Sequence, residues 1–416
     1  MRVLLTTFGS RGDVQPVFAL ATELRALGAD ARVCAPADEE FRALFAATGV
    51  PLLPAFASIR AWLAEVMPKR ATLSLPELAA QVMVNQYRAV SEAVAAFGAK
   101  GCDAIVATGL FSSVVAARAV AEKQGARYVY AAYCPYYLPS PDYKPPEYPG
   151  HPHPPGMTNN EALWKHNARA MNAVFGESLN ALRASVGLRK LDNVRDHAFT
   201  DRPLLAADPI LAPWNRSAKL STVQTGAWIL PDERPLPAAL ERFLEAGDPP
   251  VYVGFGSLPA PKEFARIAIE VLRSQGRRIL MSRGWAELAL VDDRNDCFIV
   301  GEVNQQALFP RVAAVVHHGG AGTTTAAARA GTPQVIVPQM GDQPYWASRV
   351  WDLGIGSAHD GPEPTRESLS VALEAALGRA TRAQAHAIAQ IMTADGAKRA
   401  AKLLLEGYGL RATGDG

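Results

Sequence analysis

Residues 1–36 read MRVLLTTFGSRGDVQPVFALATELRALGADARVCAP and decide the fold of the first half of the chain. An apolar run at 2–7 leads through a glycine-rich turn into a segment whose apolar residues recur at helical spacing: Val17, Leu20, Ala21 and Leu24. Gly28 stands where a helix-terminating glycine is expected, and a second apolar run follows at 31–35. A strand, a helix and a strand with short joins predict a parallel βαβ unit.

The same alternation recurs along the whole chain. In the first half, apolar runs at 103–108 and 127–132 flank a helical segment at 112–124. In the second half, a helix is expected at 263–275 and strands at 250–254, 278–282, 297–300, 313–317 and 334–338. These patterns predict an α/β protein with two Rossmann-like, doubly wound domains that face each other across a cleft, at 1–215 and 237–390, joined by a linker at 216–236. Ligands are then expected outside the carboxyl ends of the strands.

Composition narrows the class of protein. A length of 416 residues favours two domains, and 49% hydrophobic with 20% charged residues is typical of a globular chain. The net charge of +2 argues against a dedicated nucleic-acid binder. No signal peptide and no apolar run long enough to span a membrane is found, and four scattered cysteines fit a reducing compartment. We expect a cytoplasmic protein with no membrane span, and the histidine spacing predicts no metal site.

Residues 134–157 differ from the rest of the chain. Nine prolines are interleaved there with tyrosines, among them Tyr136 and Tyr137. Such a run excludes a helix or a central strand and predicts a long surface loop. The aromatic side chains favour a lid that contacts a ligand, and an ordered structural wrap is the alternative.

The stretch HHGGAGTT at 317–324 carries the most specific chemistry. It lies between a Val-rich strand and a helix expected at 325–330. Glycines at such a turn let backbone N–H groups approach an anion, and the start of a helix adds partial positive charge. Thr323, Thr324 and a histidine can donate further hydrogen bonds, so we predict a phosphate or diphosphate site that needs no metal. A plain glycine-rich turn with capping threonines is the alternative.

These residues resemble a known family. The motif at 318–323, followed by PQMGDQP at 338–344, looks like the donor-site signature of nucleotide-sugar glycosyltransferases of the GT-B fold. GSRGDV at 9–14, YLPSP at 137–141, TGAWILPDERP at 225–235 and VYVGFGS at 251–257 resemble the glycosyltransferases of vancomycin- and teicoplanin-type glycopeptides. The resemblance extends over essentially the whole chain. It implies that a C-terminal helix within 391–416 crosses back to the first domain.

The resemblance also implies the residues that bind the donor. His318 and the backbone at Gly320, Ala321, Gly322 and Thr323 would hold the diphosphate, with Ser10, Arg11 and Gly12 from the first domain and Ser257 from the second. Val303 would recognise the pyrimidine through its backbone, next to Glu302 and beside the turn that contains Arg283. Asp342 and Gln343 stand where the family binds hydroxyls of the donor sugar. For Asp342, two alternatives are that it acts as a general base or that it is simply a turn residue.

Asp13 is the residue expected to act in catalysis. Glycosyl transfer to a hydroxyl needs a base that accepts the proton of the acceptor, and a carboxylate at the site suits that role. Asp13 also precedes a helix with Pro16 near its first turn, so it could equally serve as the N-cap, and the two roles are compatible. The resemblance favours the base and implies a single displacement with inversion.

The acceptor is the least determined part of the sequence analysis. We expect it on the first domain, against Tyr136, Tyr137 and the segment 56–75, whose aromatic side chains can stack on a flat aglycone. The resemblance suggests a phenolic hydroxyl of a glycopeptide aglycone and a UDP- or dTDP-sugar donor. A sterol, macrolide or flavonoid acceptor stays open, as do a nucleotide-sugar epimerase and a catalytically silent partner protein.

Three smaller expectations complete the analysis. His317 is expected to pack behind the phosphate site rather than bind the ligand. The acidic run at 292–296 is expected to be an exposed turn without a metal. No cofactor besides the nucleotide-sugar substrate is expected, and the protein is expected to act as a monomer.

Overall fold

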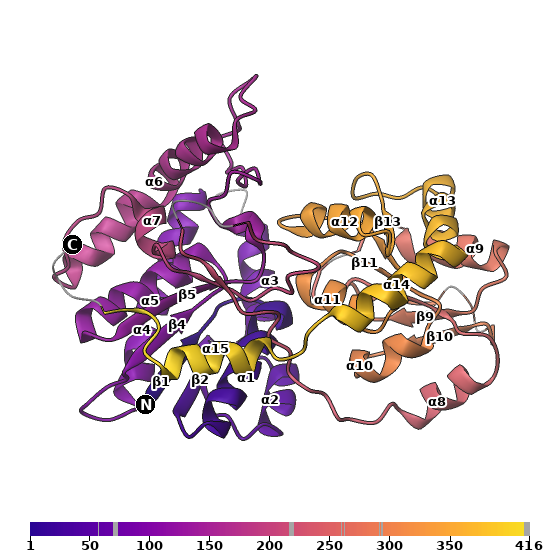
Figure 1. Cartoon of the computed structure of the whole chain (residues 1–416), viewed down its shortest axis with the longest axis horizontal. Coiled ribbons are helices and arrows are strands. Elements are labelled where there is room, and N and C mark those ends of the chain that lie inside the picture. Colours follow the sequence, from indigo (N-terminus) through magenta and orange to yellow (C-terminus); the bar gives the residue numbers. More distant parts are fainter. Residues whose placement is uncertain are drawn as a thin grey trace. The chain divides into compact units, whose positions relative to one another are not determined.

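The computed structural model describes residues 1–56, 58–69, 74–215, 220–258, 260–261, 263–290, 292 and 294–411. The chain forms two compact units, each built on its own sheet (Figure 1). Unit 1 comprises Met1–Pro209, Pro213–Leu230 and Ala394–Gly416, and unit 2 comprises Ile210–Ala212 and Pro231–Thr393. Two parallel α/β sheets confirm the predicted fold class.

The sheet of unit 1 has the order β3-β2-β1-β4-β5-β6-β7, with every neighbouring pair parallel. Val3 pairs with Ala31 on one side and with Ala104 on the other, so the predicted βαβ unit lies at the centre of this sheet. A short terminal strand, β14 (Leu410–Arg411), runs antiparallel to β5. The parallel strands are β1 (Arg2–Thr6), β2 (Asp30–Pro36), β3 (Leu52–Phe56), β4 (Ala104–Ala107), β5 (Arg127–Ala132), β6 (Leu204–Leu205) and β7 (Val223–Gln224).

The helices of unit 1 bury an apolar face against this sheet. In the first of them, Val17, Leu20 and Leu24 are buried as their spacing predicts, and Gly28 follows with a φ of +86°. The helices are α1 (Arg11–Ala26), α2 (Glu39–Ala46), α3 (Ile59–Lys69), α4 (Leu75–Ala95), α5 (Phe111–Gln124), α6 (Asn160–Ser185), α7 (Val194–Phe199) and α15 (Gly396–Leu405), with the 3-10 turn η1 (Pro135–Tyr137).

Unit 2 is a second parallel sheet, of order β10-β9-β8-β11-β12-β13. Its valines and isoleucines, such as Val253, Ile279 and Val316, are buried beneath α9 and α13. The strands are β8 (Val251–Gly254), β9 (Ile279–Ser282), β10 (Cys297–Val300), β11 (Ala314–His317), β12 (Gln334–Ile336) and β13 (Gly356–Ala358). The helices are α8 (Ala238–Glu245), α9 (Phe264–Ser274), α10 (Gln305–Leu308), α11 (Ala321–Arg329), α12 (Gln343–Asp352), α13 (Arg366–Ala376) and α14 (Arg379–Ile391), with the 3-10 turn η2 (Phe309–Arg311).

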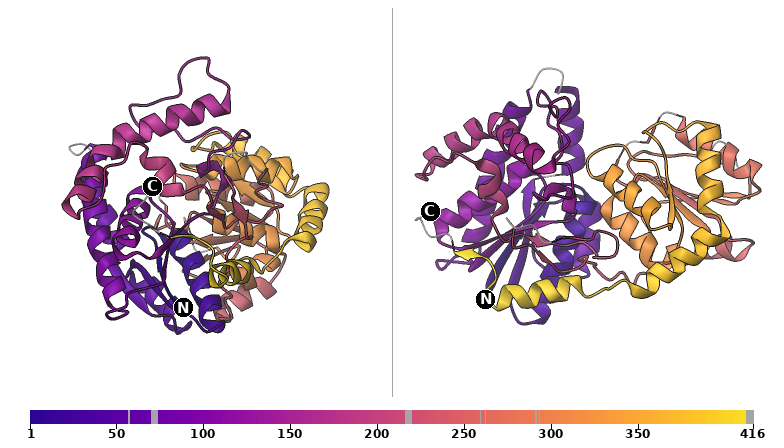
Figure 2. Two further views of the ribbon diagram at one scale, coloured as in Figure 1. Left: turned by 60° about the vertical axis from the view of Figure 1, so that its left-hand side comes forward. Right: turned by 45° about the horizontal axis from the view of Figure 1, so that its top comes forward.

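The end of the chain returns to unit 1. Helix α14 stops at Ile391, and α15 begins only at Gly396 and lies along α1 (Figures 1 and 2). Gly396 packs so tightly that a Cβ there would collide with the carbonyl oxygen of Ala227. Within the expected linker at 216–236, residues 216–219 lie outside the described residues, and Val223–Gln224 form β7 in the sheet of unit 1.

The proline- and tyrosine-rich segment 134–157 forms a loop, as predicted, apart from η1 and a single bridge between Tyr148 and His151. It is fastened to α6, because the Trp164 indole donates to the carbonyl of Tyr143 (2.9 Å) and the Asn167 amide to that of Pro146 (3.1 Å). Figure 2 shows this segment beside the start of α6. These bonds make it an ordered wrap, and its contact with a ligand remains a prediction.

A buried cluster of charges joins α5, α6 and α7. The Glu122 carboxylate bonds to Nη1 of Arg183 (2.8 Å), Nε2 of His197 (2.6 Å) and Nε of Arg118 (3.2 Å). Burial alone would raise the pKa of Glu122, but the bond and charge of His197, together with Arg183, hold it at about 2. The ionised carboxylate therefore stabilises the packing of the three helices.

We expect Glu122→Gln to lower the free energy of unfolding by about 3 kcal/mol, because it leaves buried Arg183 without its anion. The pKa of Glu122 is depressed in the folded state, so its contribution is complete above its ordinary pKa of 4.5 and disappears as the pH falls toward 2. Urea unfolding at pH 7 and pH 3 tests this. Glu270→Gln, in an ion pair with exposed Arg266, is the control and should cost less than about 1 kcal/mol. Equal losses in both variants would contradict the prediction.

The side chain of Gln86 on α4 is fully buried, and neither amide atom has a hydrogen-bond partner among the described residues. Met83 and Val90, one turn away on either side, are also buried. We expect Gln86→Met to raise the free energy of unfolding by about 1 kcal/mol, because it removes unpaired polar atoms and keeps the volume. Thermal unfolding checks the sign, and a destabilised Gln86→Met would show that the amide has a partner.

Candidate functional site

The stretch 317–324 forms the turn from β11 into α11. The first bond of the helix runs from the N–H of Thr324 to the carbonyl of Gly320 (2.9 Å), so Gly320 is the N-cap. Helix α11 thus begins at Ala321, earlier than the expected 325, and its first N–H groups belong to Ala321, Gly322 and Thr323. No acidic residue stands in this first turn, so the positive end of the helix is open to an anion.

Two glycines shape this turn. Gly319 has a φ of +91°, and a Cβ there would lie 2.6 Å from a methyl carbon of Ile336. A Cβ at Gly320 would lie 2.5 Å from Nε2 of His318, so that imidazole rests against the N-cap of α11. The Thr324 hydroxyl is buried and donates to the carbonyl of Gly320 (3.0 Å), which turns it away from a ligand, contrary to the expectation that it could donate there.

The two histidines of the turn differ in their contacts. His317 is fully buried, with both ring nitrogens hydrogen-bonded, and burial lowers its pKa to about 3. Burial also lowers the pKa of His318, to about 4, and its Nδ1 has no partner among the described residues. His318 is therefore a neutral ring at pH 7 that can donate one hydrogen bond to a ligand beside the helix start.

Neighbouring strand ends meet at His318. The turns after β8 and β9 touch each other, since the Trp285 N–H donates to the carbonyl of Gly256 (2.8 Å), and Gly284 lies so close that a Cβ there would be 2.6 Å from that oxygen. A Cβ at Gly256 would be 3.5 Å from Cε1 of His318. The segments that carry Ser257 and Arg283 thus adjoin the turn at 317–324, because β9, β8 and β11 are consecutive in the sheet. We call 317–324 the phosphate turn, after the ligand predicted from its sequence.

After β10, Glu302 is held by a residue that the sequence analysis did not single out. Arg234 donates to both carboxylate oxygens of Glu302 (2.6 and 2.9 Å) and to Asp232 (2.6 and 2.8 Å). The Asn304 amide bonds to the carbonyls of Asp232 and Arg234 (2.7 and 2.8 Å). Val303 is buried between these anchored neighbours, so its backbone is fixed at the end of β10. Arg234 stands within the quoted motif 225–235, which was the available signal.

Asp342 and Gln343 stand at the start of α12. Oδ2 of Asp342 accepts from the Trp346 indole (2.8 Å), and burial raises the pKa of Asp342. Oε1 of Gln343 accepts from the N–H groups of Gln339 (2.7 Å) and Met340 (3.0 Å), so it closes the loop after β12. The side-chain oxygen of Gln343 is thus bonded within the protein, and the contact of its side-chain NH2 group with a donor sugar remains a prediction.

In unit 1, the turn after β1 presents Asp13. Ser10 is the N-cap of α1 and Asp13 is the third helical residue, which corrects the expectation that Asp13 itself could be the N-cap. Oδ2 of Asp13 accepts from the N–H of Ser10 (3.0 Å), and a Cβ at Gly9 would collide with that oxygen. Arg11 donates to Gln15 (3.0 Å), and the Tyr133 hydroxyl donates to the Asp13 carbonyl (3.0 Å). The Asp13 carboxylate therefore has a fixed orientation at the carboxyl end of the sheet. Gly12, which follows Arg11, is exposed.

The expected acceptor residues are partly described. Tyr136 and Tyr137 are half-buried in η1, with ring centroids 5.5 Å apart in an edge-on arrangement. Of the segment 56–75, residues 57 and 70–73 lie outside the described residues. Trp62 packs edge-on against Phe8 (5.1 Å), directly after β1, so part of this segment reaches the strand end that carries Asp13.

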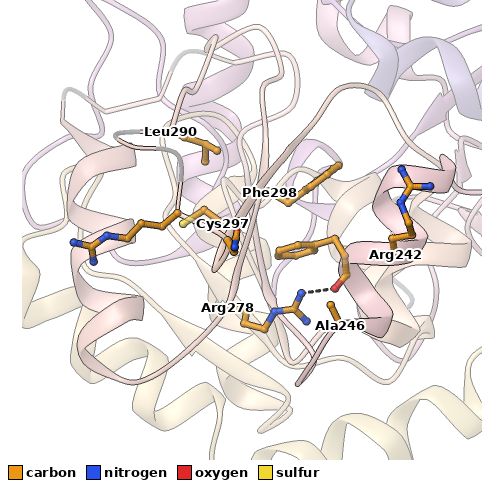
Figure 3. Close-up of a pocket in the computed structure, with 9 residues that line it drawn as sticks. Arg242, Ala246, Arg278, Leu290, Cys297 and Phe298 are labelled. Atoms are coloured by element: carbon orange, nitrogen blue, oxygen red, sulfur yellow. Dashed lines mark hydrogen bonds between the residues drawn. The ribbon is translucent and has the colours of Figure 1, made fainter.

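A cavity of about 530 Å³ lies elsewhere in unit 2, and none of the predicted site residues lines it (Figure 3). Arg278 directly precedes β9 and Cys297 is the first residue of β10, so both lie at the strand ends opposite to the phosphate turn. The Arg278 guanidinium donates to the carbonyls of Phe243 and Asp248 and lies 4.1 Å from the Phe243 ring centroid. Arg278 therefore caps the end of α8.

Within the described part of the chain, no group of three His, Cys, Asp or Glu side chains could hold a metal, and no helix is long and apolar enough to cross a membrane. In the acidic run at 292–296, Asp292 and Asp296 both bind Arg273 (2.7 and 2.8 Å), and Asp293 lies outside the described residues.

Known proteins resemble the chain over its full length. It is 52% identical over 410 residues to glycosyltransferase GtfE of Amycolatopsis orientalis, covering 98% of both chains. It is 50% identical over 406 residues to the vancomycin aglycone glucosyltransferase of that organism (98% and 97%), and 47% identical over 391 residues to its dTDP-epi-vancosaminyltransferase (92% of both chains). The family model for the erythromycin biosynthesis protein CIII-like C-terminal domain matches residues 291–401.

Solved structures agree on the fold. The glycotransferase of kitacinnamycin superposes with a TM-score of 0.71 at 19% identity, covering 97% of this chain and 98% of the other. The glycosyltransferase VinC in complex with dTDP gives 0.65 at 18% identity, with 98% and 99% covered. At this identity the likeness shows the fold alone, which is that of GT-B enzymes. Taken with the full-length relatives, the chain belongs to the family of glycopeptide-antibiotic glycosyltransferases, as its motifs predicted, and is a glycosyltransferase that uses a nucleotide sugar.

Proposed function

We propose that this glycosyltransferase moves a sugar from a UDP- or dTDP-sugar to a phenolic hydroxyl of a vancomycin-type glycopeptide aglycone, with inversion and without a metal. The observation that carries the donor half of the proposal is the neutral His318 ring against the open N-terminus of α11. The names of the relatives, a vancomycin aglycone glucosyltransferase and a dTDP-epi-vancosaminyltransferase, support the acceptor class and the dTDP alternative.

The diphosphate would bind where dipoles replace a metal ion. The N–H groups of Ala321, Gly322 and Thr323 are the first of helix α11, and the His318 ring provides one more N–H beside them. Preorganised donors of this kind stabilise negative charge as it develops on the departing nucleoside diphosphate. Gly320 would let the diphosphate approach the backbone closely, and Ser257 and Arg283 would contact it from the adjoining turns. Glu302 and Val303 would bind the nucleoside. Asp342 and Gln343 would bind hydroxyls of the sugar.

Asp13 would accept the proton of the acceptor hydroxyl. Its carboxylate is oriented by the N–H of Ser10, and a negative charge in the first turn of α1 is stabilised by the helix dipole. As the base takes the proton, the acceptor oxygen forms its bond to the anomeric carbon and the bond to the diphosphate breaks on the opposite face. One such displacement inverts the anomeric configuration. A phenol, with a pKa near 10, loses its proton to a carboxylate more readily than an alcohol does.

The remaining expectations belong to the same proposal. Unit 1, with Tyr136 and Tyr137, would bind the aglycone, and Ser10, Arg11 and Gly12 would approach the donor. The enzyme would act as a cytoplasmic monomer that binds no nucleic acid and needs no cofactor.

Asp13→Asn tests the base. Asparagine keeps an oxygen that can accept from the Ser10 N–H, so α1 should stay capped while the proton acceptor is lost. We expect kcat to fall by about 10²–10⁴-fold with little change in donor affinity. The assay is aglycone-dependent release of UDP or dTDP from their glucose and deoxysugar conjugates, with a vancomycin-type aglycone, a sterol or a flavonoid. Full activity in Asp13→Asn would reject the base, and release with only the sterol or flavonoid would reject the acceptor class.

His318→Ala tests the diphosphate site. We expect its affinity for UDP and dTDP to fall about tenfold or more, with the affinity for uridine and thymidine unchanged, because only the phosphate contact is lost.

Since the pKa of His318 is about 4, donor affinity of the wild type should not rise between pH 8 and pH 6. Calorimetric titrations at both pH values, with and without EDTA, measure this. A strong gain in affinity toward pH 6 would mean that His318 binds as the cation. Loss of donor affinity in EDTA would reject metal-free binding of the donor.

A further inference from the structure

His317, directly behind the phosphate turn, makes two hydrogen bonds that fix its tautomer. Its Nδ1 accepts from the N–H of Gly319 (3.1 Å), so the ring proton is on Nε2. Nε2 lies 2.9 Å from Oε1 of Gln334, which accepts that proton. The other half of the Gln334 amide, Nε2, donates to the carbonyl of Thr324 (3.3 Å). The Gly319 N–H can only donate and the Thr324 carbonyl can only accept, so these two groups determine the direction of all three bonds.

This chain of bonds braces the turn from both ends. Gly319 is the first glycine after the histidines, and Thr324 belongs to the first turns of α11. His317 and Gln334, both fully buried, connect the two through the interior of unit 2. Gln334 is the first residue of β12 and pairs with Val315 of β11, so its backbone is fixed by the sheet. The brace therefore ties the start of α11 to the central strands.

The bond to Gly319 also sets the position of His318. Gly319 has a φ of +91° and lies against Ile336 and the carbonyl of Gln343. Its N–H belongs to the peptide that joins it to His318, so fixing the direction of that N–H fixes the peptide and the His318 backbone. The His318 ring then rests on Gly320, beside the first amides of α11. Loss of the acceptor would leave a buried N–H unpaired and would favour a rotated peptide.

We propose that His317 is a positioning residue for the diphosphate half-site: through Gly319 and Gln334 it holds His318 and the start of α11 in the arrangement that binds the diphosphate, without touching the ligand. The inference rests on the proposed function, which places the diphosphate at this turn. It goes beyond that function in giving the other histidine of the pair a defined task.

Two substitutions separate the bonds of His317. His317→Leu removes both. His317→Asn keeps an acceptor for the N–H two residues on, the geometry of an Asx turn, and loses the bond to Gln334. His359→Leu is the matched control, because His359 is also buried in unit 2 with both nitrogens bonded, to the Gly361 carbonyl and the Ser368 hydroxyl (both 2.8 Å), outside the phosphate turn.

The measurement is the ratio of affinities for the nucleoside diphosphate and the nucleoside, UDP against uridine or dTDP against thymidine, by calorimetry. We expect His317→Leu to lower this ratio about tenfold, His317→Asn to recover most of the loss, and His359→Leu to leave the ratio unchanged. A residue needed only for folding would lower thermal stability and leave the ratio as it is. An unchanged ratio in His317→Leu, or the same fall in His359→Leu, overturns the proposal.

Two further measurements keep the test decisive. If His317→Leu does not fold, Gln334→Met removes the bond between His317 and Gln334 and leaves the bond to Gly319. The affinity ratio should then fall by a smaller factor, and an unchanged ratio in Gln334→Met overturns the proposal.

The wild-type ratio distinguishes a failure of the proposed function from a failure of the role of His317. A wild type with no preference for the diphosphate would reject the proposed function, whereas a wild type with that preference and a His317→Leu variant that keeps it would reject only the role of His317.

Discussion

The proposed donor half-site depends on a close approach of the backbone that two glycines allow. At Gly319 a Cβ would overlap Ile336, and at Gly320 it would overlap the His318 ring. Only two successive glycines let the chain leave β11 and start α11 at once, with the imidazole laid over the N-cap. The conformational entropy that glycine loses is the cost of this turn. The first amides of the helix and the His318 ring therefore lie side by side, where we propose that a bound anion contacts both.

Unit 1 carries the opposite charge at the start of a helix. Gly9 directly precedes the N-cap of α1, as Gly319 precedes that of α11, and a Cβ at Gly9 would collide with the Asp13 carboxylate. In α1 this acid occupies the first turn and satisfies the N–H of Ser10, whereas α11 has no acid in its first turn. The start of α1 is thus neutralised by its own acidic residue, which we propose as the base. The start of α11 carries no such acid and keeps its partial positive charge, which suits the anion that we propose it binds.

Most of the fold could be predicted because parallel strands are continuous apolar runs, and Gly28 and Gly125 mark helix ends whatever surrounds them. The start of α11 was predicted four residues too late, at 325. Glycine and threonine, which fill 319–324 apart from Ala321, are poor helix formers, and in the structure the helix starts within this stretch, with Thr324 buried. Arg234 was missed because its partner Glu302 is 68 residues away and the pairing depends on tertiary structure. The anchoring of 134–157 on α6 could not be predicted either, since its bonds use backbone carbonyls that any residue supplies.

The adjacent histidines of this turn have different surroundings, and we propose a different role for each. His317 is the last residue of β11 and points into the core, so the alternation of side chains along a strand directs the next one away from it. Both rings are neutral at pH 7, because burial opposes their charge. At this turn, the charge of a bound diphosphate would then be met by amide and imidazole dipoles rather than by an imidazolium ion. In the mechanism that we propose, these dipoles would bind the nucleotide sugar and the departing nucleoside diphosphate without the strong, pH-dependent attraction of an imidazolium ion. Such an attraction would slow release of the more highly charged product.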